Sequence, residues 1–345
     1  MRVPVFLRWF LLIAIPIALL RPAVAQQQYV HLRAFPLENG SLLSPCDIGY
    51  RTFGVLSKDR SNAILFPTWL GGVSADLESL LGSGRLIDTT KYFVVAVDAF
   101  GDGVSSSPST SSTQPGERFP QVSITDMVHA EKILLDTLGV PALAAVVGGS
   151  MGALQALEWA VRYPAMMQAI VAYVGTPRCT SADLVLWRTE LQAIQDGRRC
   201  GYPDSAIARR VGMVNALAIQ SPAYRSRTTP ADSTEEFIES YVRAFRRRFH
   251  ADDWALQVRA IMGQDIGWGL RGDVKEAAAR IRAKVFLIVS LQDHIVNPGP
   301  AMDLAAILGA RLLVLDNDCG HLAPSCEFER FSREVREFLD QSTRE

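Results

Sequence analysis

Apolar and polar positions along the chain follow two alternating patterns. Short apolar runs rich in Val, Ile, Leu and Ala are typical of buried strands, and longer stretches with apolar residues three or four positions apart are typical of amphipathic helices. Six runs are expected to be strands: Asn62–Phe66, Tyr92–Asp98, Leu143–Val147, Ala169–Val174, Lys284–Ser290 and Arg311–Leu315. Apolar strands that alternate with helices predict a mostly parallel sheet covered by helices on both faces, an α/β fold.

The alternation breaks between Val174 and Lys284, where helical spacing dominates. Four helices are expected there: Asp183–Asp196, Ser205–Ile219, Thr234–Phe249 and Asp253–Gln264. The pattern therefore predicts a core formed by residues 26–175 and 271–345. Residues 176–270 are expected to be a helical cap inserted between the two parts of this core.

The first 25 residues form a pattern of their own. Arg2 and Arg8 precede or flank the apolar run Trp9–Leu20, and Ala23-Val24-Ala25 follows it. A charged start, a short apolar run and an A-x-A site are the features of a cleavable signal peptide. A membrane span needs about 20 apolar residues, more than this run offers. We expect cleavage near Ala25, a secreted or periplasmic protein, and no stable membrane insertion after cleavage; an uncleaved anchor is the alternative.

The composition is that of a globular protein, with 345 residues of which 48% are hydrophobic and 21% charged. The formal net charge is −1, and removal of residues 1–25 takes away three arginines and no acidic residue, which leaves −4. This mild acidity argues against nucleic acid and anionic membranes as partners. The sequence has no metal-ligand spacing, dinucleotide-binding turn or P-loop, so no metal or cofactor is expected. A homodimer is compatible with the sequence.

Gly148-Gly149-Ser150-Met151-Gly152 is the most informative motif in the chain. It joins the expected strand Leu143–Val147 to the helix-like stretch Met151–Tyr163. A G-x-S-x-G sequence in this context predicts a nucleophile elbow, in which glycines permit a strained turn and a close approach of strand and helix. Ser150 is then the candidate nucleophile, and the amide of Met151 is a candidate oxyanion donor. An ordinary Gly/Ser turn is the alternative.

A serine hydroxyl is a poor nucleophile until an imidazole takes its proton. Three histidines follow Ser150 in the chain: His250, His294 and His321. His321 lies on a loop directly after the expected strand Arg311–Leu315, where the C-terminal end of a strand would bring it to the elbow. His321 is therefore the candidate general base, and the other two are expected to be ordinary surface histidines.

The acid of such a site comes between the serine and the histidine in the chain. Asp293 follows the expected strand Lys284–Ser290 on the next loop. A carboxylate there can accept the imidazole N–H, fix the tautomer and stabilise the imidazolium. Asp316 and Asp318 are competitors, but they crowd His321 on its own loop, so Asp293 is preferred.

Residues 148–160, Gly-Gly-Ser-Met-Gly-Ala-Leu-Gln-Ala-Leu-Glu-Trp-Ala, resemble the elbow and following helix of the homoserine O-acetyltransferase family. The family has the α/β-hydrolase fold and transfers an acyl group through an acyl-serine. The resemblance extends in chain order through Phe66–Gly72, Tyr92–Asp98 with Gly101, Arg118-Phe119-Pro120, Asp293 and Gly320-His321. It implies the α/β-hydrolase fold for this chain. It also implies that the backbone N–H of Trp69 is the second oxyanion donor, with Leu70 as the fallback.

Two positions depart from the family pattern. The transferases usually have an aspartate directly after the catalytic histidine, where it can meet the amine of the acceptor, and this chain has Leu322 there. A Pro-x-x-Gly-Leu-x-x-Ala-Arg-like segment, usual in the lid of the family, is not found in Asp204–Tyr224. Both departures argue against homoserine as the acceptor and leave acyl-serine chemistry unaffected. Leu70 and Leu322 are candidate pocket residues.

The five cysteines all follow the expected cleavage site: Cys46, Cys179, Cys200, Cys319 and Cys326. An odd number leaves at least one thiol free or paired between chains. Cys319 and Cys326 bracket the His321 loop, and a disulfide between them would hold the base in place. Cys179 and Cys200 are a second candidate pair, within the cap. Spacing alone establishes neither pairing, although an oxidising compartment permits both.

The sequence as a whole predicts an exported serine α/β-hydrolase that hydrolyses a small acyl ester through an acyl-Ser150 intermediate. Acyl-CoA donors are cytosolic, so export favours water as the acceptor, and Leu322 favours it as well. Acyl transfer from acyl-CoA, as in the homoserine O-acetyltransferases, is the alternative. A non-catalytic binding protein on the same fold is a second alternative, disfavoured because serine, acid and base are all present in the required order.

Overall fold

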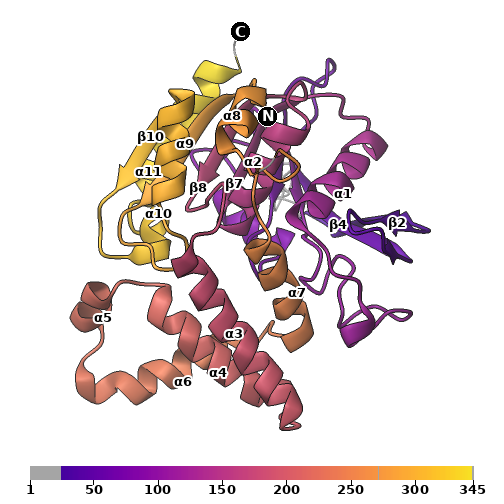
Figure 1. Ribbon diagram of the computed structural model, residues 1–345. Coiled ribbons are helices and arrows are strands. Elements are labelled where there is room, and N and C mark those ends of the chain that lie inside the picture. Colours follow the sequence, from indigo (N-terminus) through magenta and orange to yellow (C-terminus); the bar gives the residue numbers. More distant parts are fainter. Residues whose placement is uncertain (1–24, 271, 344–345) are drawn as a thin grey trace, which may run out of the picture.

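An eight-stranded sheet forms the centre of the protein (Figure 1), in a computed structural model that describes residues 25–270 and 272–343. Its strand order is β1-β4-β6-β5-β7-β8-β9-β10. The strands are β1 (Gln28–Leu32), β4 (Cys46–Phe53), β5 (Ala63–Pro67), β6 (Phe93–Val97), β7 (Leu143–Gly149), β8 (Met167–Tyr173), β9 (Lys284–Ser290) and β10 (Arg311–Leu315). A separate hairpin pairs β2 (Phe35–Pro36) with β3 (Leu42–Leu43).

The six strands expected from apolar runs are all present and mutually parallel, from β6 at one end to β10 at the other. The sequence missed β1 and β4, which pair antiparallel with each other and with β6. Strand β1 is partly exposed, and β4 mixes glycine and charged residues with apolar ones. Neither segment has the continuous apolar pattern of a central strand, so neither could be recognised as a strand from its residues alone.

Alternate residues of the central strands enter two separate apolar clusters, one on each face of the sheet. In β5, Leu65 belongs to the cluster shared with the α1 and α2 side chains, whereas Ile64 and Phe66 belong to the cluster shared with α11. Successive side chains of a strand point to opposite faces, so a strand buried on both sides must be apolar throughout. The predicted mostly parallel sheet covered on both faces is confirmed.

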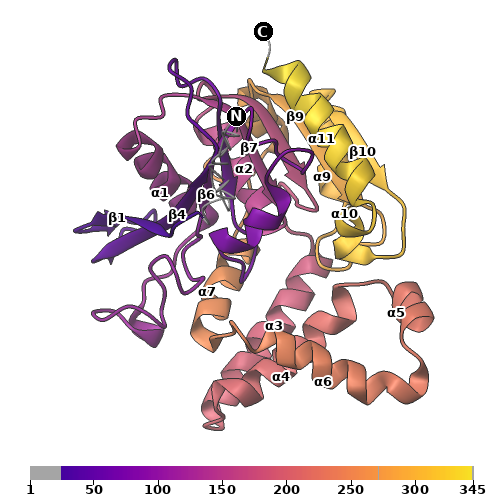
Figure 2. The same cartoon turned by 180° about the vertical axis from the view of Figure 1, so that it is seen from behind.

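Two groups of helices cover the sheet (Figures 1 and 2). One face is covered by α1 (Ile124–Thr137), α2 (Met151–Arg162), α8 (Val274–Arg280) and α9 (Gly299–Leu308). The other is covered by the 3-10 helix η1 (Ser74–Leu80) and by α11 (Phe328–Ser342), which follows the short α10 (Ala323–Cys326).

Between β8 and β9 the chain forms the helices α3 to α7, and residues 181–262 are called the helical insertion below. Its helices are α3 (Ser181–Arg199), α4 (Asp204–Ala218), α5 (Pro222–Thr228), α6 (Thr234–Phe245) and α7 (Ala251–Met262). Figures 1 and 2 show α3 to α6 as a layer of their own beyond one edge of the sheet. The four helices expected here are present, and α5 was missed because its seven residues are too few to show a period.

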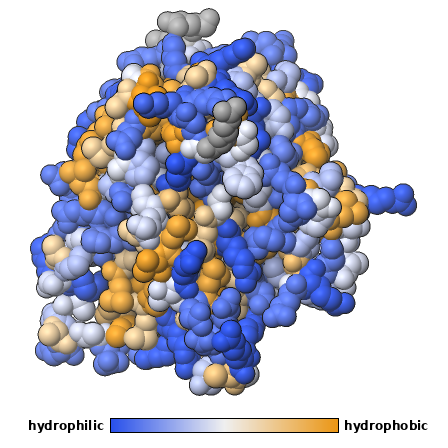
Figure 3. Space-filling view, viewed as in Figure 1, coloured by the Kyte–Doolittle hydropathy of each residue, from blue (hydrophilic) through white to orange (hydrophobic). Residues whose placement is uncertain are grey.

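Apolar side chains are exposed on the helical insertion. Figure 3 shows hydrophobic residues gathered on the lower half of the face seen in Figure 1. The exposed apolar side chains of α3 and α4 are Val185, Met213 and Leu217. A homodimer stays a prediction.

The expected signal peptide falls on residues 1–24, which lie outside the described residues. In the part of the chain that the structure describes, no helix is both long and apolar enough to cross a membrane.

One carboxyl group is buried between α1 and α2, and no cation among the described residues lies beside it. Glu131 is 2% exposed and accepts a hydrogen bond from Nε1 of Trp159, which is fully buried. Burial disfavours the charged carboxylate and raises the pKa of Glu131 to about 8. An acid whose pKa is higher in the folded protein than in the unfolded chain stabilises the fold at low pH, and this contribution is lost as the pH rises through the folded pKa.

Replacing Glu131 with Gln keeps an oxygen for Trp159 and removes the titrating group. We expect Glu131→Gln to flatten the decline in stability between about pH 4.5 and pH 8, with a gain of a few kcal/mol (roughly 2–4) at pH 8. Denaturant unfolding across this pH range measures the effect. Glu337→Gln, at an exposed position of α11, is the matched control. Parallel stability–pH curves for the Glu131→Gln variant and the parent would refute this account.

Candidate active site

Ser150 lies at the turn between β7 and α2. Its backbone conformation is one that residues other than glycine rarely adopt. Its φ is 53° and its ψ −124°. The turn is tight because glycines line it: a Cβ on Gly148 would lie 2.1 Å from Gly152 O, and a Cβ on Gly149 would lie 2.1 Å from the ring of Tyr173. Strand and helix can approach this closely only where both lack side chains. The turn thus has the geometry expected of an elbow that exposes Ser150.

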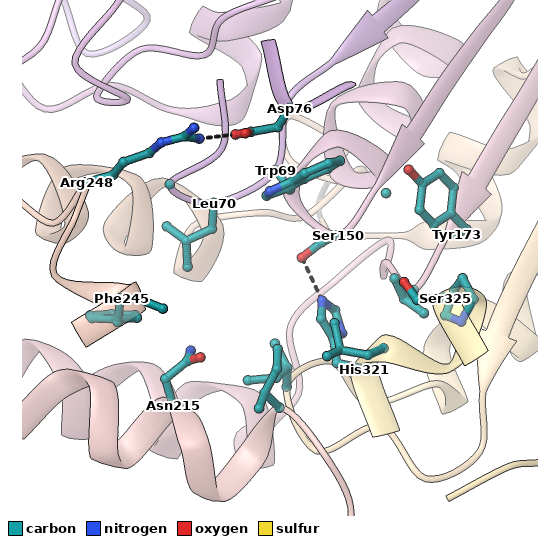
Figure 4. A pocket seen from close by; sticks show the side chains of 18 of the residues that line it. Trp69, Leu70, Asp76, Ser150, Tyr173, Asn215, Phe245, Arg248, His321 and Ser325 are labelled. Carbon is teal, nitrogen blue, oxygen red and sulfur yellow. Dashed lines mark hydrogen bonds and ion pairs between the residues drawn. The ribbon is translucent and has the colours of Figure 1, made fainter. Parts of the chain in front are cut away.

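The structure brings together the three side chains singled out from the sequence. His321 Nε2 lies 3.0 Å from Ser150 Oγ, and His321 Nδ1 lies 2.7 Å from Asp293 Oδ2. Both His321 and Asp293 are 8% exposed. The serine, the imidazole and the carboxylate form one continuous chain of hydrogen bonds (Figure 4 shows its Ser150–His321 part). The loops that carry them follow β7, β9 and β10, and the C-terminal ends of these parallel strands lie at one edge of the sheet.

The second oxygen of Asp293 is held by the backbone. Asp293 Oδ1 accepts the N–H groups of Ile295 at 2.8 Å and Val296 at 3.0 Å. Hydrogen bonds of this kind fix the orientation of the carboxyl group. Oδ2 is thereby directed to His321, where it can hold Nδ1 as the protonated nitrogen and leave Nε2 to accept from the serine.

The competing residues lie elsewhere. His294 and Asp316 are exposed, and Asp318 pairs with Arg227. His250, at the start of α7, has a side chain that is 59% exposed and lies 4.0 Å from an oxygen of Asp204. None of these is hydrogen-bonded to Ser150 or to the His321 ring in the described part of the chain.

The loop after β5 carries the amides expected to face the reacting oxygen. Gln155 of α2 donates to Thr68 O at 3.1 Å, and Gly71 N–H donates to Gln257 Oε1 at 2.8 Å. A Cβ on Gly152 would lie 2.6 Å from Pro67 O, so this loop and the start of α2 are in close backbone contact. The loop is therefore fixed directly beside the elbow.

The N–H groups of Met151, Trp69 and Leu70 donate to no protein group within residues 25–270 and 272–343. They remain available for a ligand oxygen. The structure thus leaves both Trp69 and its fallback Leu70 open as donors beside Met151.

A cavity of about 720 Å³ opens at Ser150 between the sheet edge and the helical insertion. The two candidate pocket residues, Leu70 and Leu322, line it, and so does Trp69. Most of the other lining side chains are apolar, among them Leu80, Tyr173, Val174, Trp187, Ile219, Phe245, Phe249, Trp254, Ile295, Phe328 and Phe331. In Figure 4, Leu70 and Phe245 lie on the side opposite Tyr173, with Ser150 and His321 between them. A volume of this size takes a small organic molecule rather than a polymer.

The carboxyl group of Glu190 is buried behind the part of the cavity wall that the helical insertion forms. Glu190 of α3 accepts from Trp254 Nε1 at 2.8 Å and from Asn215 Nδ2 at 3.3 Å, and Asn215 in turn accepts from the Tyr241 hydroxyl at 2.7 Å. Burial raises the pKa of Glu190 to about 7. Trp254 and Asn215 both line the cavity, so Glu190 fixes the orientation of two wall residues.

Sequence reasoning missed Glu190 and Asn215. The only available signal was their polarity on helix faces that otherwise carry apolar residues, since Glu190 follows Trp187 by one turn. Trp187 and Trp254 pack in the helical insertion and also line the cavity, whereas Trp268 is 69% exposed and does neither.

Charged side chains stand at one end of the cavity. Arg248 of the helical insertion pairs with Asp76 of η1 (Figure 4). Both residues line the cavity, as does Arg247. The side chains of Arg248 and Asp76 are 51% and 27% exposed, so solvent screens the pair and its contribution to stability is small. No group of three or more His, Cys, Asp or Glu side chains among the described residues is placed to hold a metal ion.

Cys319 and Cys326 form a disulfide that brackets His321. Cys46, Cys179 and Cys200 are free. The suggested Cys179–Cys200 pair is wrong, because these residues lie at opposite ends of the 19-residue helix α3. At 1.5 Å per residue such a helix separates its ends by about 28 Å, far beyond the reach of a disulfide.

Comparisons with known proteins agree with this geometry. Residues 64–325 match the model of the family described as alpha/beta hydrolase fold. The chain is 30% identical to a homoserine O-acetyltransferase from Geobacter metallireducens, over 89% of this chain and 95% of the relative. It is 31% identical to an ethyl acetate hydrolase from Pseudomonas veronii, over 77% of this chain and 80% of the relative.

A solved structure of the acetyl esterase MekB superposes with a TM-score of 0.85 at 27% identity, covering 92% of this chain and 97% of that one. The resemblance to homoserine O-acetyltransferases drawn from the elbow and its surrounding motifs is confirmed. The fold that this resemblance implies is confirmed as well.

The cysteine assignment can be tested by counting thiols. We expect three titratable thiols in the denatured, unreduced protein and five after reduction. In the folded protein Cys200, which is exposed, should react first, because burial raises the pKa of Cys46 and of Cys179 to about 12. Peptide mapping under non-reducing conditions should recover a Cys319–Cys326 linked peptide. Five thiols without reduction, or a link to any other cysteine, would contradict the assignment.

Proposed function

Because the chain belongs to the alpha/beta hydrolase fold family, we propose that it is a serine esterase that cleaves a small acyl ester through an acyl-Ser150 intermediate. The observation that carries the proposal is the hydrogen-bonded chain from Ser150 through His321 to Asp293 at the floor of an apolar cavity. The similarity to the ethyl acetate hydrolase and the acetyl esterase supports an ester as substrate.

In the first half of the reaction Ser150 Oγ attacks the ester carbonyl carbon, and His321 Nε2 takes the hydroxyl proton. Asp293 keeps Nδ1 protonated and stabilises the imidazolium. The tetrahedral intermediate then collapses: the carbon–oxygen bond to the alcohol breaks, and His321 returns the proton to the departing oxygen. The acyl group remains on Ser150 as an ester.

In the second half a water molecule takes the place of the alcohol. His321 removes a proton from the water as its oxygen attacks the acyl carbon, and the same proton is returned to Ser150 Oγ as the carboxylic acid leaves. This step regenerates the free Ser150 hydroxyl. The apolar wall of the cavity limits bulk water at the site, which strengthens the electrostatic interactions within it.

The developing negative charge on the carbonyl oxygen is stabilised by the amides of Met151 and Trp69, with Leu70 as the alternative to Trp69. The close backbone contact between Pro67 and Gly152 supports this role, since it holds both amide-bearing segments together. Preset amide donors of this kind each lower a barrier by roughly 3 kcal/mol.

Leu322 supports water as the acceptor. It directly follows His321 in the chain and lines the cavity, so the cavity has an apolar side chain at this position. An apolar side chain at this position cannot pair with the ammonium group of an acceptor such as homoserine, which disfavours amine-bearing acceptors. Acyl transfer remains the alternative function, because the homoserine O-acetyltransferase from Geobacter metallireducens matches 89% of the chain.

We further propose that the chain acts outside the cytosol after removal of residues 1–25. The Cys319–Cys326 disulfide supports this location, since structural disulfides persist in oxidising compartments. Acyl-CoA is cytosolic, so an exported enzyme is better suited to hydrolysis.

Ser150→Ala should abolish ester hydrolysis, with a loss of at least about 10⁴-fold in kcat, because no hydroxyl remains to form the acyl-enzyme. A serine-directed phosphonate should label Ser150 and no other residue. Ser325→Ala is the matched control: Ser325 lines the same cavity without a hydrogen bond to His321, and its loss should leave kcat nearly unchanged. Turnover near the parental rate in Ser150→Ala would exclude the acyl-serine mechanism, and binding without turnover in the parent would favour a binding protein.

The acceptor can be tested with the purified mature protein. We expect hydrolysis of short acyl esters and no O-acetylhomoserine from acetyl-CoA and homoserine. Leu322→Asp should increase the use of amine-bearing acceptors by about tenfold or more, because its carboxylate can pair with the ammonium group. Leu322→Asn, which is polar but uncharged, is the control and should give a much smaller increase. Efficient acetylation of homoserine by the parent protein would establish the transferase alternative instead.

A further inference from the structure

The loop that carries His321, residues 317–322 (the base loop), is held from two sides. On the core side the disulfide between Cys319 and Cys326 closes it. On the other side it lies against residues 219–227 (the corner), where α4 ends and α5 begins. Figures 1 and 2 both show α5 beside the loops that surround α10. The base loop is therefore supported by the helical insertion as well as by the core.

Backbone atoms of the corner and the base loop are in direct contact. His321 N–H donates to Ile219 O at 3.0 Å. A Cβ on Gly320, whose φ is +65°, would lie 2.8 Å from Gln220 Cα and 3.0 Å from Ser221 N. The two segments thus pack without space for a side chain, and any displacement of the corner is transmitted to His321.

Asp318 joins the base loop to the corner through its carbonyl and its carboxylate. Ser221 Oγ donates to Asp318 O at 2.6 Å and accepts the Tyr224 N–H at 3.1 Å, which places it at the start of α5. Arg227, one turn of helix further, donates from Nη2 to Asp318 Oδ1 at 2.9 Å and from Nε to Oδ2 at 3.1 Å. A two-point contact between guanidinium and carboxylate fixes orientation as well as distance.

The contact is better suited to positioning than to stability. The side chains of Arg227 and Asp318 are 61% and 26% exposed, and exposed ion pairs contribute little to the free energy of unfolding. Proton transfer, by contrast, depends on the 3.0 Å separation of His321 Nε2 and Ser150 Oγ. A displacement of about 1 Å at a catalytic group can lower a rate by about 100-fold.

We propose that Arg227 is a positioning residue for the general base, acting through Asp318 to hold His321 against Ser150. The inference rests on the proposed function, since it concerns the group that moves the proton. In this proposal the helical insertion contributes to the catalytic geometry through Arg227, which lies 94 residues before His321 in the chain. Arg227 itself touches neither the substrate nor the reacting atoms.

Arg227→Ala should lower kcat for a short acyl ester by about tenfold and leave KM within about twofold, because the cavity wall is intact while the base is less well placed. The rate at which a small phosphonate inactivates the enzyme should fall in parallel, since it reports the reactivity of Ser150 independently of ester binding. The melting temperature should change by less than about 2 °C.

Arg209→Ala is the matched control, because it breaks another exposed pair of the helical insertion, Arg209–Glu239, far from the base loop. It should leave kcat and the inactivation rate unchanged. The exchange Arg227→Asp with Asp318→Arg should recover most of the activity that either single charge reversal loses. Such recovery shows that the contact itself, rather than either side chain alone, positions the base.

Two outcomes would overturn the inference. One is kcat within twofold of the parent in Arg227→Ala; the other is a raised KM with unchanged kcat, which would assign Arg227 to the cavity instead. Failure of the proposed function is distinguishable, because it would appear as turnover in Ser150→Ala. Loss of activity in Ser150→Ala together with a silent Arg227→Ala would refute the positioning role alone.

Discussion

The site depends on how closely β7 and α2 approach each other at the turn that carries Ser150. Gly148 and Gly152 are in backbone contact across this turn, and Gly149 lies against the ring of Tyr173. A side chain on Gly148 would push helix and strand apart, and one on Gly149 would collide with the ring of Tyr173 in β8. The strained conformation of Ser150 persists because the sheet on one side and the helix on the other determine it. The close packing of α2 also brings Gly152 against Pro67, so the same contact fixes the loop that offers the amides of Trp69 and Leu70.

The base is held by a second and different kind of constraint. Ser150 and Asp293 are fixed close to the sheet, since Ser150 follows β7 directly and Asp293, three residues beyond β9, accepts two amides of its own loop. His321 sits farther from its strand, on a loop that a disulfide and the corner of the helical insertion support. The helical insertion therefore has two roles: it lines the cavity and it supports the loop that carries His321. Substitutions in the helical insertion can thus act on turnover without touching the ligand.

Two of the buried carboxyl groups of the protein lie in its core and behind its cavity wall, respectively. Glu131 between α1 and α2 and Glu190 behind the cavity wall both have raised pKa values, to about 8 and about 7, and in each case the cause is burial. Each carboxyl orients a tryptophan: Glu131 holds Trp159 in the core, and Glu190 holds Trp254 at the cavity. Polar groups inside the protein favour one arrangement of bulky aromatic neighbours, because any other arrangement leaves them without partners.

The sequence by itself determined the parallel part of the sheet, the elbow at Ser150 and the order of serine, acid and histidine. These features are local: an apolar strand, a glycine-rich turn and the loop after a strand are each written in a few consecutive residues. Because parallel strands present their C-terminal ends at one edge, local patterns were also enough to name His321 and Asp293 as the residues that would meet Ser150.

Only the tertiary structure decided what depends on contacts between distant segments. It added β1 and β4, whose mixed pattern is stable only as an antiparallel extension of the sheet. It paired Cys319 with Cys326 and left Cys179 and Cys200 free, because a straight helix keeps the latter two apart. It paired Asp318 with Arg227, and it placed Glu190 behind the cavity wall. The partner of a charged or polar side chain is set by the packing of the whole chain, and local sequence carries no record of that packing.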